Sequence, residues 1–511
     1  MSGIAVGEYG SGLDAVSEKP EKILPGDARY GELSHSDNHR FEVTPDAFIL
    51  PLNSYGVVSA LREAIDDRSE VACRSGGHCG QDFVGSPRRN TILDLHRLNF
   101  VAAGAGNSGV RIGAGATVGE VQKELFRRWG AALPLGACSA VGMGGLVAGG
   151  GYGPLSRQLG LVADHLNAVE VAVVDSSRHV QLVTARASDD GELGDLFWAH
   201  TGGGGGNFGF ATAYEFRSPK HLTGTDIELP RACTALNVQK VIYPWTMLNE
   251  DSFVSLVQQF FAWHEQHQVG GTPEASVFAT FFLHHNSSPF LQLMVQSDAD
   301  IDVDGSALAA FVDGLTAGTA INGISRGGRM TWLTGTRYMS QADCGDVMGA
   351  RSASKSAYHR KALTDTQISV VYRHLTNQHP GTASYLMLNS YGGEINRRGS
   401  SETASTQRDS IVKSSWFTAW SDPADDYLQV DWLRDLYESV FASTGGVPIF
   451  GDTTAGCYIN YPDIDMRDPA RNRSGQPWHR LYYGENYARL QRTKRTWDPL
   501  NIFHHKMSIE P

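Results

Sequence analysis

Two glycine-rich stretches contain residues that could surround a bound group. The first, residues 134–157, has glycine at eight positions, no Lys or Arg before its last residue, and Cys138 near its start. Glycine costs about 0.5–1 kcal/mol per residue in regular structure relative to alanine, so this density is expected where the backbone bends freely or approaches a bound group closely. The stretch therefore predicts one wall of a buried cofactor site. A second run, residues 202–209, follows later.

A shorter motif, Arg74-Ser-Gly-Gly-His78, ends a predicted strand that begins at residue 70. Successive backbone N–H groups in such a turn can form a concave anion-binding nest, and Arg74 supplies a positive charge beside it. We interpret the turn as a diphosphate site. The same residues also fit a plain hairpin bend with an exposed histidine, and the motif alone does not decide between the two.

Composition excludes several classes of function. The formal charge is −12, from 43 Lys and Arg against 55 Asp and Glu, and no basic run could neutralise a nucleic acid or an anionic membrane surface. The six cysteines are scattered, and no CxxC pair or HExxH helix suggests a metal site. We find neither a secretion signal nor an apolar run of about 18 residues, so we expect a soluble, cytoplasmic protein.

The elements that must position these motifs alternate irregularly. Strands are predicted at 41–51, 91–95, 110–116, 168–175 and 179–184, and amphipathic helices at 57–65 and 118–129. This order is not a regular βαβ repeat. Neither glycine stretch is a G-x-G-x-x-G opening a helix and followed by an acid, so a nicotinamide-binding fold is not favoured.

Further motifs complete a pattern that runs along nearly the whole chain. They are residues 74–78, Cys138 with 141–145, 149–157 with 160–164, 202–209, 458–463 and 497–503. In this order they resemble the berberine-bridge-like, FAD-linked oxidases of the vanillyl-alcohol oxidase and p-cresol methylhydroxylase superfamily. Residues 74–79, 198–201 and 354–367 are most similar to bacterial natural-product oxidases such as the glycopeptide hexose oxidases and tirandamycin-type oxidases.

The resemblance implies an α+β fold. A two-part FAD-binding domain of the vanillyl-alcohol oxidase type would comprise residues 26–220 and 451–511, after a flexible lead at 1–25. Residues 221–450 would form a substrate domain in which helices cover an antiparallel sheet. Its predicted helices are 252–266, 304–315 and 432–442, its predicted strands are 276–283, 289–297 and 383–390, and 397–406 is predicted as a surface loop.

The resemblance also implies FAD attached covalently at two points, the 8α-methyl carbon through His78 and C6 through Cys138. A turn histidine and a buried inert thiol are the alternative interpretations of these residues. Ser139 stands where the family's plant members commonly have proline, which affects the expected alignment of the thiolate. The other expected cofactor-binding residues are Arg74, Ser75, Gly76, Gly77, Gly142, Gly144, Gly145, Gly149, Gly150, Tyr152, Gly205, Asn207, Gly209, Tyr458 and Asn460, and no metal is expected.

Three tyrosines are the catalytic candidates that the resemblance implies. Alcohol oxidation needs an acceptor for the hydroxyl proton as hydride leaves the carbon. The family's C-terminal Tyr-x-Asn-Tyr matches Tyr458 to Tyr461, with Tyr461 as the favoured base and Tyr458 as the second choice. Tyr391 stands where related oxidases have a further active-site residue. Outside the resemblance, a tyrosine in a β-rich segment is more often a packing residue.

The predicted function is that of an FAD-dependent oxidase in natural-product (antibiotic) biosynthesis. It would oxidise a hydroxyl of a sugar or polyketide-like small molecule by proton abstraction and hydride transfer to flavin N5, and O₂ would be reduced to H₂O₂. The C-terminal motif lacks the carboxylate base of the plant bridge-forming enzymes. We therefore rank second a same-fold enzyme that couples oxidation to C–C or C–O bond formation or to oxygen insertion. A flavin-free binding protein, which would be colourless, is the third alternative. The sequence leaves the oligomeric state open.

Overall fold

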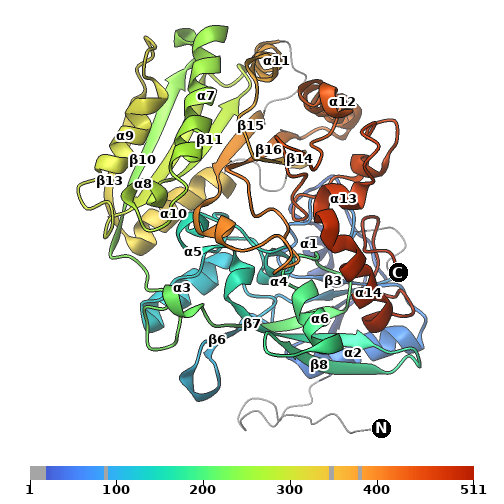
Figure 1. Ribbon diagram of the computed structural model, residues 1–511. Helices are drawn as coiled ribbons and strands as arrows, with labels where there is room; N and C mark the ends of the chain where they lie inside the picture. The colour runs from blue at the N-terminus through green and yellow to red at the C-terminus, as the bar shows by residue number, and fades with distance from the viewer. Residues whose placement is uncertain (1–18, 86–89, 345–349, 378–382) are drawn as a thin grey trace.

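A computed structural model of the protein describes residues 19–85, 90–344, 350–377 and 383–511 (Figure 1). Within these residues the strands form three sheets, two smaller ones in the lower half of the view and a larger one above them. The first half of the chain supplies the smaller sheets. The C-terminal helices return to pack beside them (Figure 1).

The first sheet has the strand order β1-β2-β4-β3. Its last three strands are parallel, and helix α2 makes the crossover from β2 to β3. Asn53 caps this helix by accepting a hydrogen bond from the Gly56 N–H, and Val57 and Leu61 lie on its buried face. Residues 21–23, inside the expected flexible lead, form strand β1, whose backbone pairs antiparallel with β2. The bounds are β1 Glu21–Ile23, β2 Ala47–Leu50, β3 Val71–Arg74, β4 Thr91–Asp94, α1 Tyr30–Ser34 and α2 Ser54–Asp66.

The second sheet is antiparallel, in the order β5-β6-β9-β7-β8. Helix α3, at the residues predicted for it, begins with a capping box between Thr117 and Glu120 and is followed by Gly130 in the left-handed conformation. Within the first glycine stretch, residues 143–148 form the short helix α4. The bounds are β5 Val101–Ala103, β6 Val110–Gly113, β7 Leu166–Val174, β8 Val180–Arg186, β9 Phe210–Phe216, α3 Val118–Trp129, α4 Met143–Ala148, α5 Ser156–Leu159 and α6 Gly191–Ala199.

The third sheet has seven antiparallel strands in the order β13-β10-β12-β11-β15-β16-β14. Alternate side chains point to opposite faces. On one face, Phe281 packs on Phe260 of helix α7, with ring centroids 6.0 Å apart. Helices α9, α11 and α12 lie on the outside of the sheet with α7 (Figure 1). The strands are β10 Ala235–Pro244, β11 Phe278–His284, β12 Phe290–Asp298, β13 Ile324–Thr331, β14 Arg351–His359, β15 Ala383–Ser390 and β16 Val412–Trp420.

The remaining helices connect and cover these sheets. They are α7 Glu250–Gln266, α8 Pro273–Ser276, α9 Ser306–Leu315, α10 Trp332–Cys344, α11 Asp365–Thr376, α12 Asp426–Val440, α13 Trp478–Tyr483 and α14 Tyr487–Trp497. Short 3₁₀ helices are Ala105–Asn107, Val162–His165, Lys220–Leu222, Trp245–Met247, Gly393–Arg397, Pro423–Asp425, Ala442–Thr444, Ile464–Arg467 and Gly484–Asn486.

A buried lysine fixes the returning C-terminal segment to the second glycine run. Lys494, on α14, donates to Asp498 and to the backbone carbonyls of Asn207 (2.8 Å) and Phe503 (2.6 Å). Both charged groups of the Lys494–Asp498 pair are fully buried. A buried charge needs such partners. The end of the chain and the 202–209 run therefore form one unit.

The α+β class and the antiparallel sheet covered by helices are confirmed. The prediction of a surface loop at 397–406 is wrong for its second half, where Thr403 and Ser405 are buried. The Asn486 side chain donates to the carbonyl of Thr403 (3.1 Å), and nearby Arg408 makes a two-point ion pair with Asp164. Distant side chains thus satisfy polar groups that a loop would otherwise leave to solvent.

Candidate active site

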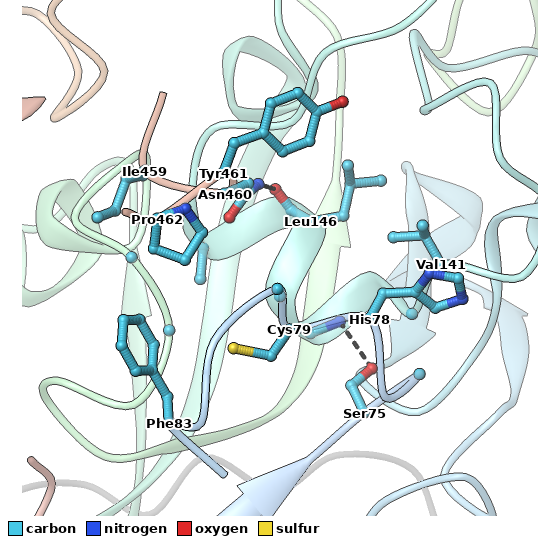
Figure 2. A pocket seen from close by; sticks show the side chains of 18 of the residues that line it. Ser75, His78, Cys79, Phe83, Val141, Leu146, Ile459, Asn460, Tyr461 and Pro462 are labelled. Atoms are coloured by element: carbon cyan, nitrogen blue, oxygen red, sulfur yellow. Dashed lines mark hydrogen bonds between the residues drawn. The ribbon is translucent and has the colours of Figure 1, made fainter. Parts of the chain in front are cut away.

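A cavity of about 450 Å³ lies where the three sheets and the C-terminal segment meet. Its walls include the turn after β3, both glycine stretches, and one face of the seven-stranded sheet. In Figure 2, His78 and Ser75 line one side, and Tyr461, Asn460 and Pro462 of the C-terminal segment line another. Segments hundreds of residues apart in the sequence thus border one space.

Most of the predicted site residues line this cavity. They are Arg74, Ser75, Gly76, Gly77, His78, Cys138, Gly142, Gly144, Gly145, Tyr152, Gly205, Asn207, Gly209, Tyr458, Asn460 and Tyr461. Three others lie behind the wall. A Cβ at Gly149 would collide with the Asn460 side chain, and one at Gly150 would collide with Ser405. Tyr391 packs against Tyr152, with ring centroids 5.4 Å apart.

The turn after β3 and the first glycine stretch touch backbone to backbone. A Cβ at Gly76 would collide with the backbone nitrogen of Gly142, and a Cβ at Gly142 would collide with Ser75. Ser75 Oγ also bridges the two segments, donating to Ala114 O (2.6 Å) and accepting from Gly144 N–H (3.2 Å). Glycine at 76 and 142 is therefore required for contact between the walls, before any ligand is considered.

Arg74 has a different role from the one its charge suggested. The residue is 7% exposed, and its side chain donates to Asp94 (2.7 Å) and to the Leu33 carbonyl (2.6 Å). Although burial opposes the change, a hydrogen bond from His96 and the charge of Arg74 lower the pKa of Asp94. The guanidinium therefore holds the end of β3 in place, and its charge is paired with Asp94.

The two residues expected to attach a cofactor both face the cavity. His78 is partly buried, with Nδ1 3.4 Å from a carboxylate oxygen of Asp37. Cys138 is disulfide-bonded in this structure. Nearby Cys79 is a free thiol whose pKa is raised by burial. A bond from Cys138 to a bound group therefore requires its reduced form.

The glycines also leave room for a ligand. A Cβ at Gly145 would meet nothing within 4 Å, and one at Gly205 would meet only the Ala148 Cβ, at 4.0 Å. Both residues line the cavity. Backbone that approaches a cavity without side chains is what a long, flat, phosphate-bearing cofactor needs. The residues present therefore fit FAD.

The three candidate tyrosines have different surroundings. Tyr461 lines the cavity and is only half-buried, whereas Tyr458 is 7% exposed and Tyr391 is 1% exposed. Burial raises the pKa of Tyr458 to about 12, although a hydrogen bond from Asn460 opposes the change. Burial also raises the pKa of Tyr391, whose hydroxyl donates to the Gln407 carbonyl. Tyr461 is the least enclosed of the three phenols.

Sequence reasoning missed Lys413, on β16. This lysine is fully buried, and its Nζ lies 4.2, 4.6 and 5.0 Å from the ring centroids of Tyr461, Tyr152 and Tyr458. Burying an ammonium group is costly unless nearby groups stabilise it, and aromatic ring faces do so. The available signal was a lone lysine within the otherwise uncharged strand 412–420.

A second buried lysine holds the segment that carries Tyr461. Lys355, on β14, donates to Asp463 (2.6 Å) and Asp465 (2.7 Å), and Arg434 also pairs with Asp465. The Pro462 carbonyl accepts a hydrogen bond from Gln81 (3.3 Å), close to His78 in the sequence. The Tyr461 segment is therefore joined to the large sheet and to the turn that follows β3.

The described residues contain no group of three or more His, Cys, Asp or Glu side chains arranged to hold a metal ion. No helix among them is long and apolar enough to cross a membrane.

Comparison with known proteins agrees with this geometry. Residues 45–180 match the sequence profile described as "FAD binding domain", and residues 457–510 match the one described as "Berberine and berberine like". The chain is 41% identical to aclacinomycin-N/aclacinomycin-A oxidase of Streptomyces galilaeus, over 96% of this chain and 90% of that protein.

Two solved structures are also similar. One is GilR, an oxidoreductase that catalyses the terminal step of gilvocarcin biosynthesis, in complex with pregilvocarcin. Its TM-score is 0.95 at 67% identity, over 96% of this chain and 100% of that one. The other is glycopeptide hexose oxidase DBV29 complexed with teicoplanin, with a TM-score of 0.91 at 36% identity, over 97% and 99% of the two chains. The prediction of FAD as the cofactor is confirmed.

The glycine contacts lead to a prediction with two separate readouts. Gly142→Ala should lower both the melting temperature and the flavin content, because its Cβ would separate the two walls. Gly145→Ala should lower flavin content and leave the melting temperature of flavin-free protein unchanged, because its Cβ would only enter the cavity. Gly31→Ala, an exposed glycine with open space around it, is the control. Equal effects of Gly142→Ala and Gly31→Ala would contradict the prediction.

Proposed function

The chain belongs to the berberine-bridge-like family of FAD-dependent oxidoreductases, and we propose that it oxidises a hydroxyl group of a sugar or polyketide-type natural product during antibiotic biosynthesis, with O₂ as the acceptor. The names of the similar proteins support this substrate class. The observation that carries the proposal is a half-buried phenol, Tyr461, that lines the cavity beside the buried ammonium group of Lys413. We also propose the division into an FAD domain (26–220 and 451–511) and a substrate domain (221–450).

The glycine-rich walls would hold the cofactor. Backbone N–H groups of the turn at 75–77 and of Gly205 and Gly206 would be the donors for the diphosphate, since those of Gly203 and Gly204 already donate to backbone carbonyls. His78 and Cys138 would be the attachment points for the flavin ring. A nitrogen nucleophile and a thiolate are both suited to bonding an electron-poor ring. The bound FAD supplies a hydride acceptor that can be reoxidised by O₂, giving H₂O₂.

Tyr461 would accept the substrate's hydroxyl proton. The Lys413 ammonium group, 4.2 Å from its ring centroid, favours the ionised phenol by its charge. Tyr458 is less suited because burial raises its pKa to about 12, and Tyr391 is less suited because it lies outside the cavity. Tyr458 and Tyr391 would instead support the rings around Lys413.

The bond-forming alternative has less support. Among the described residues that line the cavity, Asp37 is the only acid, and its carboxylate faces His78. The described lining residues therefore provide no carboxylate beside Tyr461 as a second base. We retain simple alcohol oxidation as the proposal.

Covalent attachment can be tested by denaturation. Wild-type polypeptide should keep its flavin after acid precipitation, as a fluorescent, mass-shifted species. His78→Ala and Cys138→Ala should each keep one attachment, while the double variant should release its flavin. Because Cys138 must be reduced to react, protein produced with a reductant should carry at least as much doubly attached flavin as protein produced without one. Free flavin in the acid supernatant of the wild type would rule out covalent attachment.

The role of Tyr461 predicts a selective kinetic loss. Tyr461→Phe keeps the ring and should retain bound oxidised flavin. Its flavin reduction in an anaerobic single turnover, with a hydroxyl substrate identified from a panel of glycosylated metabolites, should slow by about 10²–10⁴-fold, the usual contribution of a positioned base. Reoxidation by O₂ should change much less. Tyr458→Phe is the matched control, and a larger loss in that variant would transfer the role to Tyr458.

The Lys413 charge predicts a change in pH dependence. Lys413→Met removes the positive charge beside Tyr461, so the phenolate is disfavoured and the alkaline rise in the rate of flavin reduction should move to higher pH. Lys413→Arg keeps the charge and should restore most of the wild-type profile. A uniform loss of rate in Lys413→Met, with no shift of the profile along the pH axis, would indicate packing alone.

A further inference from the structure

Asp37 is the acid that faces the expected attachment residue His78. One of its carboxylate oxygens lies 3.4 Å from Nδ1 of the imidazole ring. The other oxygen, Oδ1, is buried and has no hydrogen-bond partner among the described residues. Asp37 is also the only acid among the described residues that line the cavity. A carboxylate with unused capacity to accept a proton therefore lies beside the ring that is expected to react.

The backbone holds this acid against the turn that carries His78. The Asp37 N–H donates to the carbonyl of Gly77 (3.1 Å), the residue before His78. The next residue, Asn38, is 2% exposed, and its side-chain amide donates to the carbonyl of Gly80 (3.3 Å). The segment is thus bonded to the turn on both sides of His78. These contacts fix the position of Asp37 relative to the imidazole ring.

Attachment of a flavin at His78 would release protons. A bond between a ring nitrogen of His78 and the 8α carbon replaces one N–H bond and one C–H bond, so two protons and two electrons leave. O₂ is the oxidant, and it takes up two electrons and two protons to give H₂O₂. The imidazole ring gains positive charge as the C–N bond forms, and a nearby carboxylate favours this step by stabilising the charge and accepting the N–H proton.

Resting on the proposed attachment of FAD through His78, we propose that Asp37 is the general base of that attachment. It accepts the proton from Nδ1 of His78 as the C–N bond forms, and the proton then passes to solvent. The bond to Cys138 does not require Asp37, because a thiolate is the nucleophile there and has no proton to lose. Loss of the Asp37 carboxylate should therefore affect one attachment point and spare the other.

The two attachment points can be measured separately because they lie in different tryptic peptides, 75–88 and 129–157. Full-length chain produced without flavin and with a reductant is mixed with FAD in air, and the peptides are followed over time by mass spectrometry. Flavin attached at both points joins the two peptides into one cross-linked species. Flavin attached at Cys138 alone leaves peptide 75–88 unmodified.

In Asp37→Asn, the cross-linked species should form about 10²–10⁴-fold more slowly than in the wild type, the usual contribution of a positioned base. Peptide 129–157 should still acquire flavin at the wild-type rate, which also shows that the variant folds and binds FAD. Asp37→Glu keeps a carboxylate and should restore most of the rate. Added acetate should accelerate the reaction of Asp37→Ala, which a purely structural role of Asp37 would not allow.

The control is Asp82→Asn, because this acid follows His78 in the chain, pairs with Lys506 and is not among the described residues that line the cavity. It should form the cross-linked species at the wild-type rate. An Asp37→Asn protein that does the same would overturn the proposal, as would an Asp37→Ala protein that acetate does not accelerate. Equal slowing at both peptides in Asp37→Asn and Asp37→Glu would indicate lost FAD binding and would also overturn it.

The same experiment separates this role from the proposals on which it rests. A wild-type peptide 75–88 that never acquires flavin would refute the attachment at His78 and the role of Asp37 with it. Wild-type cross-linking that Asp37→Asn leaves unchanged would refute the role of Asp37 alone. Because no hydroxyl substrate is present, the outcome does not depend on the oxidase function.

Discussion

The contact between Gly76 and Gly142 is the constraint on which the site depends. Backbone meets backbone there, and neither position has room for a Cβ. This approach brings the turn after β3 against the start of α4, so glycine backbone forms part of one wall of the cavity, beside the side chains of His78, Val141 and Leu146. Main-chain N–H groups are fixed donors that cost no side-chain entropy to position. The high glycine content is therefore explained by wall-to-wall packing as well as by ligand binding.

Buried charges close the other walls. Lys494 joins the C-terminal helix to the 202–209 run, and Lys355 joins the Tyr461 segment to the large sheet. Lys494 donates to the carboxylate of Asp498, and Lys355 donates to that of Asp465. Removing one partner of such a pair leaves an uncompensated buried charge, which typically costs 3–5 kcal/mol. Segments from both ends of the sequence are thereby held with defined geometry around one cavity.

Differences in burial separate tyrosines that look equivalent in the sequence. Tyr458 and Tyr461 are three residues apart in one motif and both line the cavity near Lys413, yet Tyr458 is 7% exposed whereas Tyr461 is only half-buried. Enclosure in an apolar environment disfavours the phenolate, and a nearby ammonium group favours it.

The sequence by itself predicted the fold class and the cofactor, because the order of its motifs resembles a known family, and most of the site residues that it predicted line the cavity. Strands with clear apolar patterns, such as β11, β12 and β15, were also found. The sequence did not reveal strands β14 and β16 or the pairing of Arg74 with Asp94. It also did not reveal that Lys413 lies among three tyrosine rings. Only the tertiary structure decided these, since each depends on strand register or on contacts between residues far apart in the chain. Tyr391 is the converse case, because its motif pointed to the site and packing placed it one layer behind.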